Sequence, residues 1–339
     1  MLIFRCDTNR IIASGHLMRC LSIADAAVDL GIDVVFVSSD GSGEDIIKGR
    51  GYNNYILNTQ WNDLDSEIDC VCVLVDSLIK GYRNEKNIMI VDSYYASSSY
   101  LKKLKEHILV AYMDDFGKEV YPVDYIICYA IYAKGMDIWN KYNNTQLLLG
   151  MDYVPLRKAF NITTSYPVRM ECDCLLIMSG GSDEYSVIKK LLDSIDENDF
   201  ERIYAICGLY NKDYDDLLLQ YSNDNRIHIV KNTNNVSDYM KKADVVISAA
   251  GSTLYELCAI GAPTISYVIA DNQLQNAYYF DREGLIPYAG DAREIDTINK
   301  IIDMLKAFTY EKRIEYNNQM MKYRIRTGAT NIVRTMLES

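Results

Sequence analysis

The run Ile88-Met89-Ile90-Val91-Asp92 (IMIVD) decides the fold, because four consecutive apolar residues end abruptly in a carboxylate. A strand with one face in water would alternate apolar and polar residues, whereas an uninterrupted apolar run suits a strand that is buried on both faces. Such strands belong to parallel sheets that are covered by helices on both sides. Asp92 then marks the carboxyl end of a strand, where open α/β sheets collect their ligands.

Similar runs lie before and after this one, alternating with segments of helical periodicity. In the first half we expect a helix from residue 17 to Gly31 and further strands at 2–6, 34–37, 71–75, 108–113 and 125–128. In the second half we expect strands at 174–178, 203–207, 227–230, 245–248 and 263–268, and helices at 187–195, 236–241 and 253–260. The sequence therefore predicts an α/β chain of two doubly wound, Rossmann-like domains that face an interdomain cleft. We expect a first domain at 1–150, a linker at 151–170, a second domain at 171–320 and a C-terminal helix at 321–339.

The charge and the apolar content of the sequence limit which kinds of molecule the protein is expected to bind. The formal net charge of −12 argues against nucleic acid, which requires a clustered basic surface, but leaves room for a local phosphate site. No run of about 18 apolar residues is present and the N-terminus lacks a signal-peptide layout, so we expect a soluble, cytoplasmic protein without stable membrane insertion. The sequence predicts no oligomeric state.

The nine cysteines include two C-x-C pairs, Cys70/Cys72 and Cys172/Cys174. We expect each pair to lie on one face of a strand, and no Cys or His follows at zinc-finger spacing. Buried, reduced cysteines and no metal site are therefore expected.

A first candidate site follows the first expected strand, in Ile11–Cys20 (IIASGHLMRC). Gly15 allows a tight turn, and His16 stands at a helix start, where free N–H groups and the helix dipole attract an anion and favour neutral imidazole as a base. On position alone, a polar helix-start residue without chemistry is the simpler interpretation.

Three strand ends in the second half offer further candidates. Met178–Asp183 (MSGGSD) forms either a plain turn or a diphosphate cradle, in which Gly180 and Gly181 allow close backbone approach and Ser182 caps a helix or touches phosphate. It has neither the Walker lysine nor a full G-x-G-x-x-G pattern. The second candidate is Gly251-Ser252-Thr253, a helix start that would favour an anion, followed by Glu256 in the first turn of that helix. Glu256 is either a ligand of the ribose or an acidic residue that the helix dipole favours. The third candidate is the polar loop Asp271-Asn272-Gln273.

In their order along the chain, these motifs resemble the UDP-sugar hydrolases of pseudaminic acid biosynthesis. That family is similar in turn to the two-domain MurG-type glycosyltransferases and to a spore-coat polysaccharide protein. The segments that carry the resemblance are Arg5-x-Asp7, Gly15-His16-x-x-Arg19-Cys20-Leu21, Val91-Asp92-Ser93-Tyr94, Asp114-Asp115, Tyr153-x-x-Leu156-Arg157-x-x-Phe160, Gly180–Asp183, Ser248–Glu256, Asn272-Gln273, Arg326-Thr327-Gly328-Ala329 and Ile332-Val333.

The resemblance implies a GT-B fold and hydrolysis of UDP-2,4-diacetamido-2,4,6-trideoxy-β-L-altropyranose to free sugar and UDP, without cofactor or metal. His16 would be the general base on a water that attacks the anomeric carbon, and Tyr94 would orient sugar or water. Helix N-termini would stabilise the departing diphosphate. The residues implied in substrate binding are Asp7, Gly15 and Arg19, then Gly180, Gly181, Ser182, Gly251, Ser252 and Thr253 for the diphosphate, Glu256 for the ribose, and Asn272 and Gln273 for the sugar.

Two departures from the family pattern and two alternative functions remain open. Ala13 replaces the first glycine of Gly-x-Gly-His, and Cys128 and Ala130 stand where relatives often carry amides, which leaves the identity of the sugar open. The alternatives are a glycosyltransferase with a UDP-sugar donor and a non-catalytic nucleotide-sugar binding protein. The acidic composition and the lack of an amphipathic membrane segment favour the hydrolase over the transferase.

Overall fold

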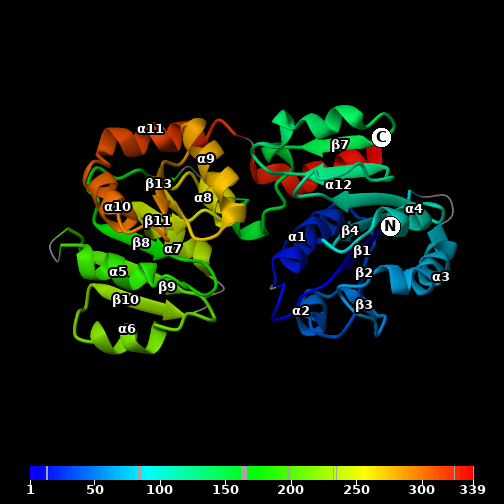
Figure 1. Cartoon of the computed structure of the whole chain (residues 1–339), viewed down its shortest axis with the longest axis horizontal. Coiled ribbons are helices and arrows are strands. Elements are labelled where there is room, and N and C mark those ends of the chain that lie inside the picture. Colours follow the sequence, from blue (N-terminus) through cyan, green and yellow to red (C-terminus); the bar gives the residue numbers. More distant parts are fainter. Residues whose placement is uncertain are drawn as a thin grey trace. The chain divides into compact units, whose positions relative to one another are not determined.

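A computed structural model of the chain describes residues 1–12, 14–82, 86–161, 166–196, 199–231, 233, 235–323 and 325–338. Ala13 lies outside the described residues. The strands are β1 Leu2–Cys6, β2 Val34–Ser38, β3 Asn53–Ile56, β4 Ile88–Asp92, β5 Leu109–Met113, β6 Tyr125–Cys128, β7 Gln146–Leu149, β8 Cys174–Met178, β9 Arg202–Cys207, β10 Ile227–Lys231, β11 Val245–Ala249, β12 Thr264–Val268 and β13 Tyr288–Asp291 (Figure 1). The α-helices are α1 Gly15–Asp29, α2 Glu44–Gly49, α3 Ile68–Leu78, α4 Ser98–Lys105, α5 Val187–Ser194, α6 Tyr214–Gln220, α7 Val236–Lys242, α8 Thr253–Ile260, α9 Leu274–Arg282, α10 Thr297–Lys306, α11 Tyr310–Met320 and α12 Gly328–Glu338.

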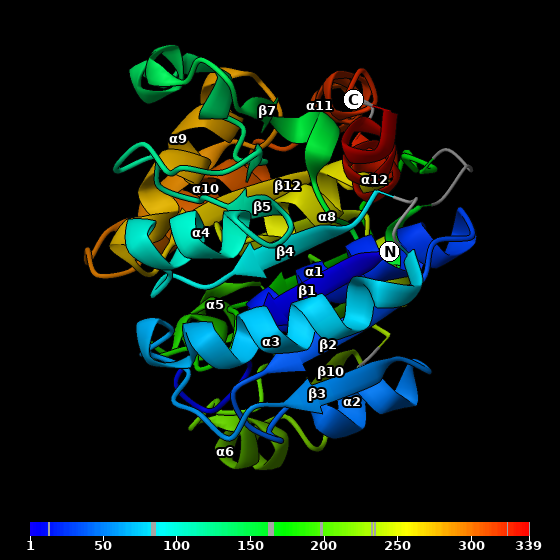
Figure 2. The same ribbon diagram turned by 90° about the vertical axis from the view of Figure 1, so that its right-hand side faces the viewer.

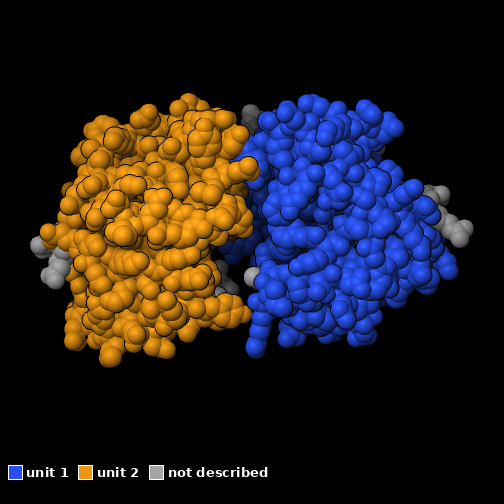
Figure 3. All heavy atoms as spheres, in the orientation of Figure 1, with its two compact units in different colours: residues 1–158, 326–339 blue, residues 159–325 orange. Residues whose placement is uncertain are grey.

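The chain divides into two compact units, which Figure 3 draws in different colours. Unit 1 comprises Met1–Lys158 and Arg326–Ser339, and unit 2 comprises Ala159–Ile325. The first crossing between the units, after Lys158, falls inside the stretch 151–170 that was expected to be a linker. The chain therefore passes between the units twice, and its last helix belongs to unit 1.

Unit 1 is built on a parallel seven-stranded sheet in the order β3-β2-β1-β4-β5-β6-β7. Alternate residues of β1 enter separate cores, with Leu2 and Phe4 in one and Ile3 in the other. The first core also receives side chains of α1, α2 and α12, and the second receives side chains of α3 and α4. Figure 2 shows α3 and α4 in front of the strands of this sheet. This layered, all-parallel arrangement explains why β4 is buried from end to end.

Unit 2 contains a parallel six-stranded sheet in the order β10-β9-β8-β11-β12-β13. Helices α5, α6 and α10 contribute to its main apolar core. Helices α7, α8 and α9 contact β8, β11 and β12. The prediction of two doubly wound α/β domains is therefore confirmed.

One expected strand is wrong. Residues 71–75 belong to helix α3, in which Val71 and Val75 are fully buried while Val73 is 71% exposed. The i, i+4 spacing of the buried valines follows the helical repeat, but the apolar residues between them hide it. The prediction that Cys70 and Cys72 lie on one face of a strand is therefore also wrong, since Cys70 is exposed and Cys72 is buried on this helix. The other expected strands and helices are confirmed to within about two residues at their ends.

The last helix, α12, packs against α1 in unit 1. Its side chains Ile332, Val333 and Met336 join the core that contains Leu17 and Leu21 of α1. Gly328, the first residue of α12, has no room for a side chain, because a β-carbon would lie 2.1 Å from the carbonyl oxygen of Val154. Glycine at the start of the last helix is thus required by a backbone contact.

Candidate functional site

The candidate base lies at the point of unit 1 where the strand order reverses. The chain runs from β1 outward to β2 and β3, and then returns to β4 on the other side of β1. Ligands of open α/β sheets bind at such switch points, at the carboxyl ends of the strands. Helix α1 follows β1 and begins at Gly15, which places His16 in its first turn beside the end of β4.

His16 is paired with Asp92, the last residue of β4. The imidazole Nδ1 lies 2.6 Å from Asp92 Oδ1, and His16 and Asp92 are 9% and 1% exposed. At this distance the carboxylate accepts the Nδ1 proton of a neutral imidazole, which leaves the lone pair on Nε2. This is the arrangement in which a carboxylate orients a histidine base.

Arg19, one turn further along α1, links two carboxylates. Its Nε donates to Asp92 Oδ2 at 2.6 Å, and its Nη1 donates to both oxygens of Asp115 at 2.9 Å. Nη1 also donates to the Tyr129 hydroxyl at 3.0 Å. Burial alone would raise the pKa of Asp92, but the charge of Arg19 and the hydrogen bonds from Arg19 and His16 outweigh it and hold that pKa well below its ordinary value. These contacts of Arg19 hold Asp92, Asp115 and Tyr129 together, and its role as a substrate ligand stays a prediction.

Tyr94 lies beside His16, as its role in orienting sugar or water would require. The two rings meet edge to face with their centroids 4.6 Å apart. The Tyr94 hydroxyl donates to Asp115 Oδ2 at 2.7 Å, and its ring packs against Phe116 at 5.0 Å. Half of Tyr94 remains exposed, so its ring and oxygen can meet a ligand.

Asp7 belongs to a separate buried network. One carboxylate oxygen accepts from Arg5 at 2.6 Å, and the other accepts from the backbone and hydroxyl of Ser39 at 2.7 and 2.8 Å. Arg5 also pairs with Glu67, and its guanidinium is fully buried. These contacts tie the ends of β1 and β2 together, so the carboxylate of Asp7 serves the scaffold and its role as a substrate ligand stays a prediction.

In unit 2, the glycine pair Gly180-Gly181 follows β8 as an exposed turn. Gly180 has a φ of 75°, a left-handed conformation that suits glycine. The capping role considered for Ser182 belongs to Asp183, whose carboxylate accepts from the backbone N–H groups of Val187 and Ile188 at the start of α5. Ser182 itself is exposed, so it remains available to a ligand.

Gly208, which follows β9, packs against this turn. The sequence did not predict a role for it. A β-carbon on Gly208 would lie 2.2 Å from the carbonyl oxygen of Gly181 and 2.3 Å from that of Gly180. The two loops therefore touch backbone to backbone. A single glycine in a loop carries no distinct pattern, so only the contact identifies it.

The other predicted residues of unit 2 gather around the ends of β11 and β12. Ser252 is exposed just before α8, and Glu256 is half-buried in the first turn of that helix. The side-chain amide of Gln273 accepts from the backbone of Ile269 at 3.0 Å, and its Nε2 lies 3.8 Å from where a β-carbon of Gly251 would be. Asn272 is exposed.

Strands β8, β11 and β12 are neighbours, with the switch point of unit 2 between β8 and β11. The predicted diphosphate loops therefore share the edge where ligands bind.

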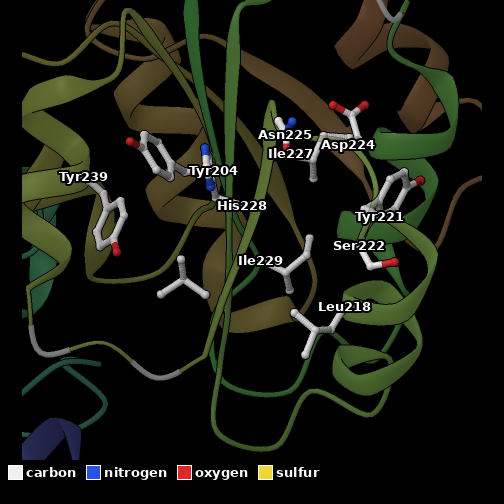
Figure 4. A pocket seen from close by; sticks show the side chains of 11 residues that line it. Tyr204, Leu218, Tyr221, Ser222, Asp224, Asn225, Ile227, His228, Ile229 and Tyr239 are labelled. Carbon is white, nitrogen blue, oxygen red and sulfur yellow. The ribbon is translucent and has the colours of Figure 1, made fainter.

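A cavity of about 490 Å³ lies elsewhere in unit 2, along the edge strand β10. Figure 4 shows Tyr204, His228 and Tyr239 on one side of β10, and Leu218 and Tyr221 of the α6 region on the other. None of the predicted site residues lines it. We place the candidate residues at the strand ends of each unit, because ionisable partners lie there in unit 1 and open backbone turns lie there in unit 2.

Within the described ranges, no group of three or more His, Cys, Asp or Glu side chains is arranged to hold a metal ion. In the same part of the chain, no helix is long and apolar enough to cross a membrane. All nine cysteines are free thiols.

Three curated proteins share low sequence identity with the chain. An uncharacterised protein, MJ1062, of Methanocaldococcus jannaschii is 26% identical over 79% of this chain and 55% of its own length. The spore coat polysaccharide biosynthesis protein SpsG of Bacillus subtilis is 25% identical over 61% of this chain and 63% of its own. The Helicobacter pylori pseudaminic acid cytidylyltransferase and UDP-2,4-diacetamido-2,4,6-trideoxy-beta-L-altropyranose hydrolase is 24% identical over 83% of this chain and 46% of its own. The matched region thus spans about half to two thirds of the length of these relatives.

Solved structures share the fold over the whole chain. Acinetobacter baumannii MurG aligns with a TM-score of 0.66 and 11% identity, covering 100% of this chain and 99% of that one. UDP-GlcNAc 2-epimerase of Neisseria meningitidis aligns with a TM-score of 0.63 and 14% identity, covering both chains completely. The chain thus has the two Rossmann-like domains of the GT-B fold, and its residues 175–335 match the glycosyltransferase family 28 C-terminal domain.

Proposed function

We propose that the protein hydrolyses a UDP-sugar to UDP and free sugar, with UDP-2,4-diacetamido-2,4,6-trideoxy-β-L-altropyranose as its substrate. The observation that carries this proposal is the buried His16–Asp92 pair at the switch point of unit 1. The hydrolase activity in the name of the Helicobacter pylori relative supports the choice of substrate.

In the proposed reaction, His16 Nε2 takes a proton from water as the water oxygen bonds to the anomeric carbon. The bond between that carbon and the diphosphate oxygen breaks, and its electron pair leaves with UDP. Asp92 keeps the other ring nitrogen protonated and stabilises the imidazolium that forms. A positioned base of this kind contributes about 10²–10⁴-fold to the rate.

Unit 2 is proposed to hold UDP. Its Gly180-Gly181 turn exposes backbone after β8, and the neighbouring strand β11 leads to the start of α8, where N–H groups and the helix dipole favour an anion. Glu256 would bind the ribose, and Asn272 and Gln273 would bind the sugar. The match of this region to the glycosyltransferase family 28 C-terminal domain supports the assignment.

The direct test is incubation of the proposed substrate with protein, without acceptor, followed by mass spectrometry of the products. His16→Ala should lower kcat by about 10²–10⁴-fold and leave the Kd for UDP unchanged. His107→Ala is the matched control, because His107 also faces an aspartate, Asp76 at 3.0 Å, but on an exposed surface. Equal turnover in all three proteins would exclude His16 as the base.

A glycosyltransferase is the second candidate, because a family 28 domain match and the MurG fold are both features of UDP-sugar transferases. The same assay separates the two functions. Release of free sugar without acceptor favours the hydrolase, whereas UDP binding without release directs the search to an acceptor.

A further inference from the structure

Tyr94 is held in one hydrogen-bonding state by its neighbour. Its hydroxyl lies 2.7 Å from Asp115 Oδ2, and a carboxylate can only accept a hydrogen bond. Both oxygens of Asp115 in turn accept hydrogen bonds from Nη1 of Arg19 at 2.9 Å. The phenolic proton of Tyr94 is therefore donated to Asp115.

The electrostatics keep that proton in place. Burial, and next the negative charge of Asp115, raise the pKa of Tyr94 well above its ordinary value. A neutral phenol whose proton is already donated can still accept one further hydrogen bond at oxygen. Toward a ligand, Tyr94 thus offers an acceptor and no donor.

We propose that Asp115 is a positioning residue that makes Tyr94 a hydrogen-bond acceptor for the C2 substituent of the sugar, so the substrate carries a donor there, such as an acetamido N–H. The inference rests on the proposed function, in which His16 acts on water that attacks the anomeric carbon of the sugar. The Tyr94 ring lies 4.6 Å from the ring of the proposed base, and C2 is the carbon next to the one that this base addresses. A sugar without a donor at C2 leaves the oxygen of Tyr94 unpaired and should bind roughly tenfold to a hundredfold more weakly.

Asp115→Asn tests the direction of the hydrogen bond at almost constant shape. Arg19 must keep an acceptor, so the asparagine oxygen stays toward Arg19 and its NH₂ group turns toward Tyr94. The Tyr94 oxygen then accepts from Asn, and its own O–H points toward the substrate. Two donors would face each other, and affinity for the acetamido sugar should fall.

The experiment measures Kd by calorimetry in a His16→Ala background, which stops the proposed turnover, for the proposed UDP-sugar and for its analogue methylated at the C2 acetamido nitrogen. With Tyr94 and Asp115 intact, this protein should prefer the parent compound by roughly tenfold to a hundredfold. Tyr94→Phe and Asp115→Asn should each abolish that preference, the double variant should equal the single ones, and the Kd for UDP alone should not move. Tyr95→Phe is the matched control, since this neighbouring tyrosine is 46% exposed and packs on Trp61 instead.

An Asp115→Asn variant that keeps the wild-type preference overturns the role of Asp115, and a Tyr94→Phe variant that keeps it overturns the contact itself. If Asp115→Asn does not fold, the Tyr94→Phe arm with both ligands still decides the contact. Binding is measured in the His16→Ala background and sugar release in the protein with His16 intact. Discrimination of the two ligands together with no sugar release refutes the hydrolase and leaves the inference standing.

Discussion

Asp92 is ionised in a place where burial opposes charge. The carboxylate is 1% exposed and is surrounded by Arg19, His16 and the thiol of Cys20. Removing an uncompensated charge from water is costly, so the guanidinium is what makes this position tolerable. Asp92 Oδ1 also contacts His16 Nδ1 at 2.6 Å, so stability and the proposed catalysis depend on one side chain.

Asp92→Asn should therefore weaken both properties. Because the pKa of Asp92 is lower in the folded than in the unfolded chain, its charge stabilises the fold above the ordinary aspartate pKa of about 3.9, and this contribution is lost as the pH falls below that value. The free energy of unfolding should thus drop less between pH 7 and pH 3 in Asp92→Asn than in the wild type, as measured by urea denaturation. Turnover should fall by up to the ~10²–10⁴-fold that a positioned base contributes.

Asp69→Asn provides the control for that measurement. Its side chain is 87% exposed and pairs with a lysine on the surface, so the variant should follow the wild-type pH dependence. An Asp92→Asn profile that also coincides with the wild type would refute the stabilising role of the buried charge.

The sequence predicted His16 and Tyr94 as site residues but could not predict the pairing of His16 with Asp92. His16 and Tyr94 stand in recognisable local settings, a helix start and a strand end, and the structure brings their rings together. The pairing of His16 with Asp92 joins residues 76 positions apart, and only the order of strands in the sheet makes them neighbours. No local pattern contains that information.

At the scale of elements, continuous apolar runs predicted the central strands well but misled at α3. Strand β4 and residues 71–75 look alike in sequence, yet one is buried on both faces and the other shows Val73 to solvent. Periodicity cannot separate a short apolar strand from a short apolar helix. The edge strand β3, with the sequence NNYI, escaped prediction for the opposite reason, since a half-exposed strand with two asparagines lacks an apolar run.

The contact between the loops after β8 and β9 gives a prediction for unit 2. Gly208→Ala should force the Gly180-Gly181 backbone to move, because the added carbon would overlap both carbonyl oxygens. We expect a loss of about 1–3 kcal/mol in stability, as for overpacked sites, and at least a tenfold weaker Kd for UDP.

Thermal unfolding and calorimetric titration with UDP check that prediction. Gly49→Ala is the control, since an added carbon there meets nothing within 4 Å. Wild-type affinity in Gly208→Ala would show that the shape of the turn does not matter for UDP, and would move the proposed diphosphate site to the start of α8 alone.

On the scale of the whole molecule, unit 1 depends on a helix that the chain adds after completing unit 2. Ile332 of α12 is fully buried in the core that it shares with α1. Ile332→Ala should cost about 2–5 kcal/mol, as expected for a large-to-small core substitution. Hydrogen exchange should quicken in α1 and β1, while α5 and β8 of unit 2 keep their protection.

Leu219→Ala is the control for this variant, because Leu219 of unit 2 is 76% exposed and should leave exchange in both units unchanged. Uniform loss of protection in α1 and α5 after Ile332→Ala would mean that the two units unfold together as one cooperative block.

The discontinuity of unit 1 also sets an order of events on the ribosome. Translation delivers β1 and α1 first, but α12, which completes their core, emerges only after every residue of unit 2. Unit 2 is one uninterrupted segment, so it can fold as soon as it leaves the exit tunnel. Until α12 emerges, part of the apolar face of α1, the helix that carries His16, stays uncovered. We expect a chaperone that shields exposed apolar surface to bind the nascent chain there.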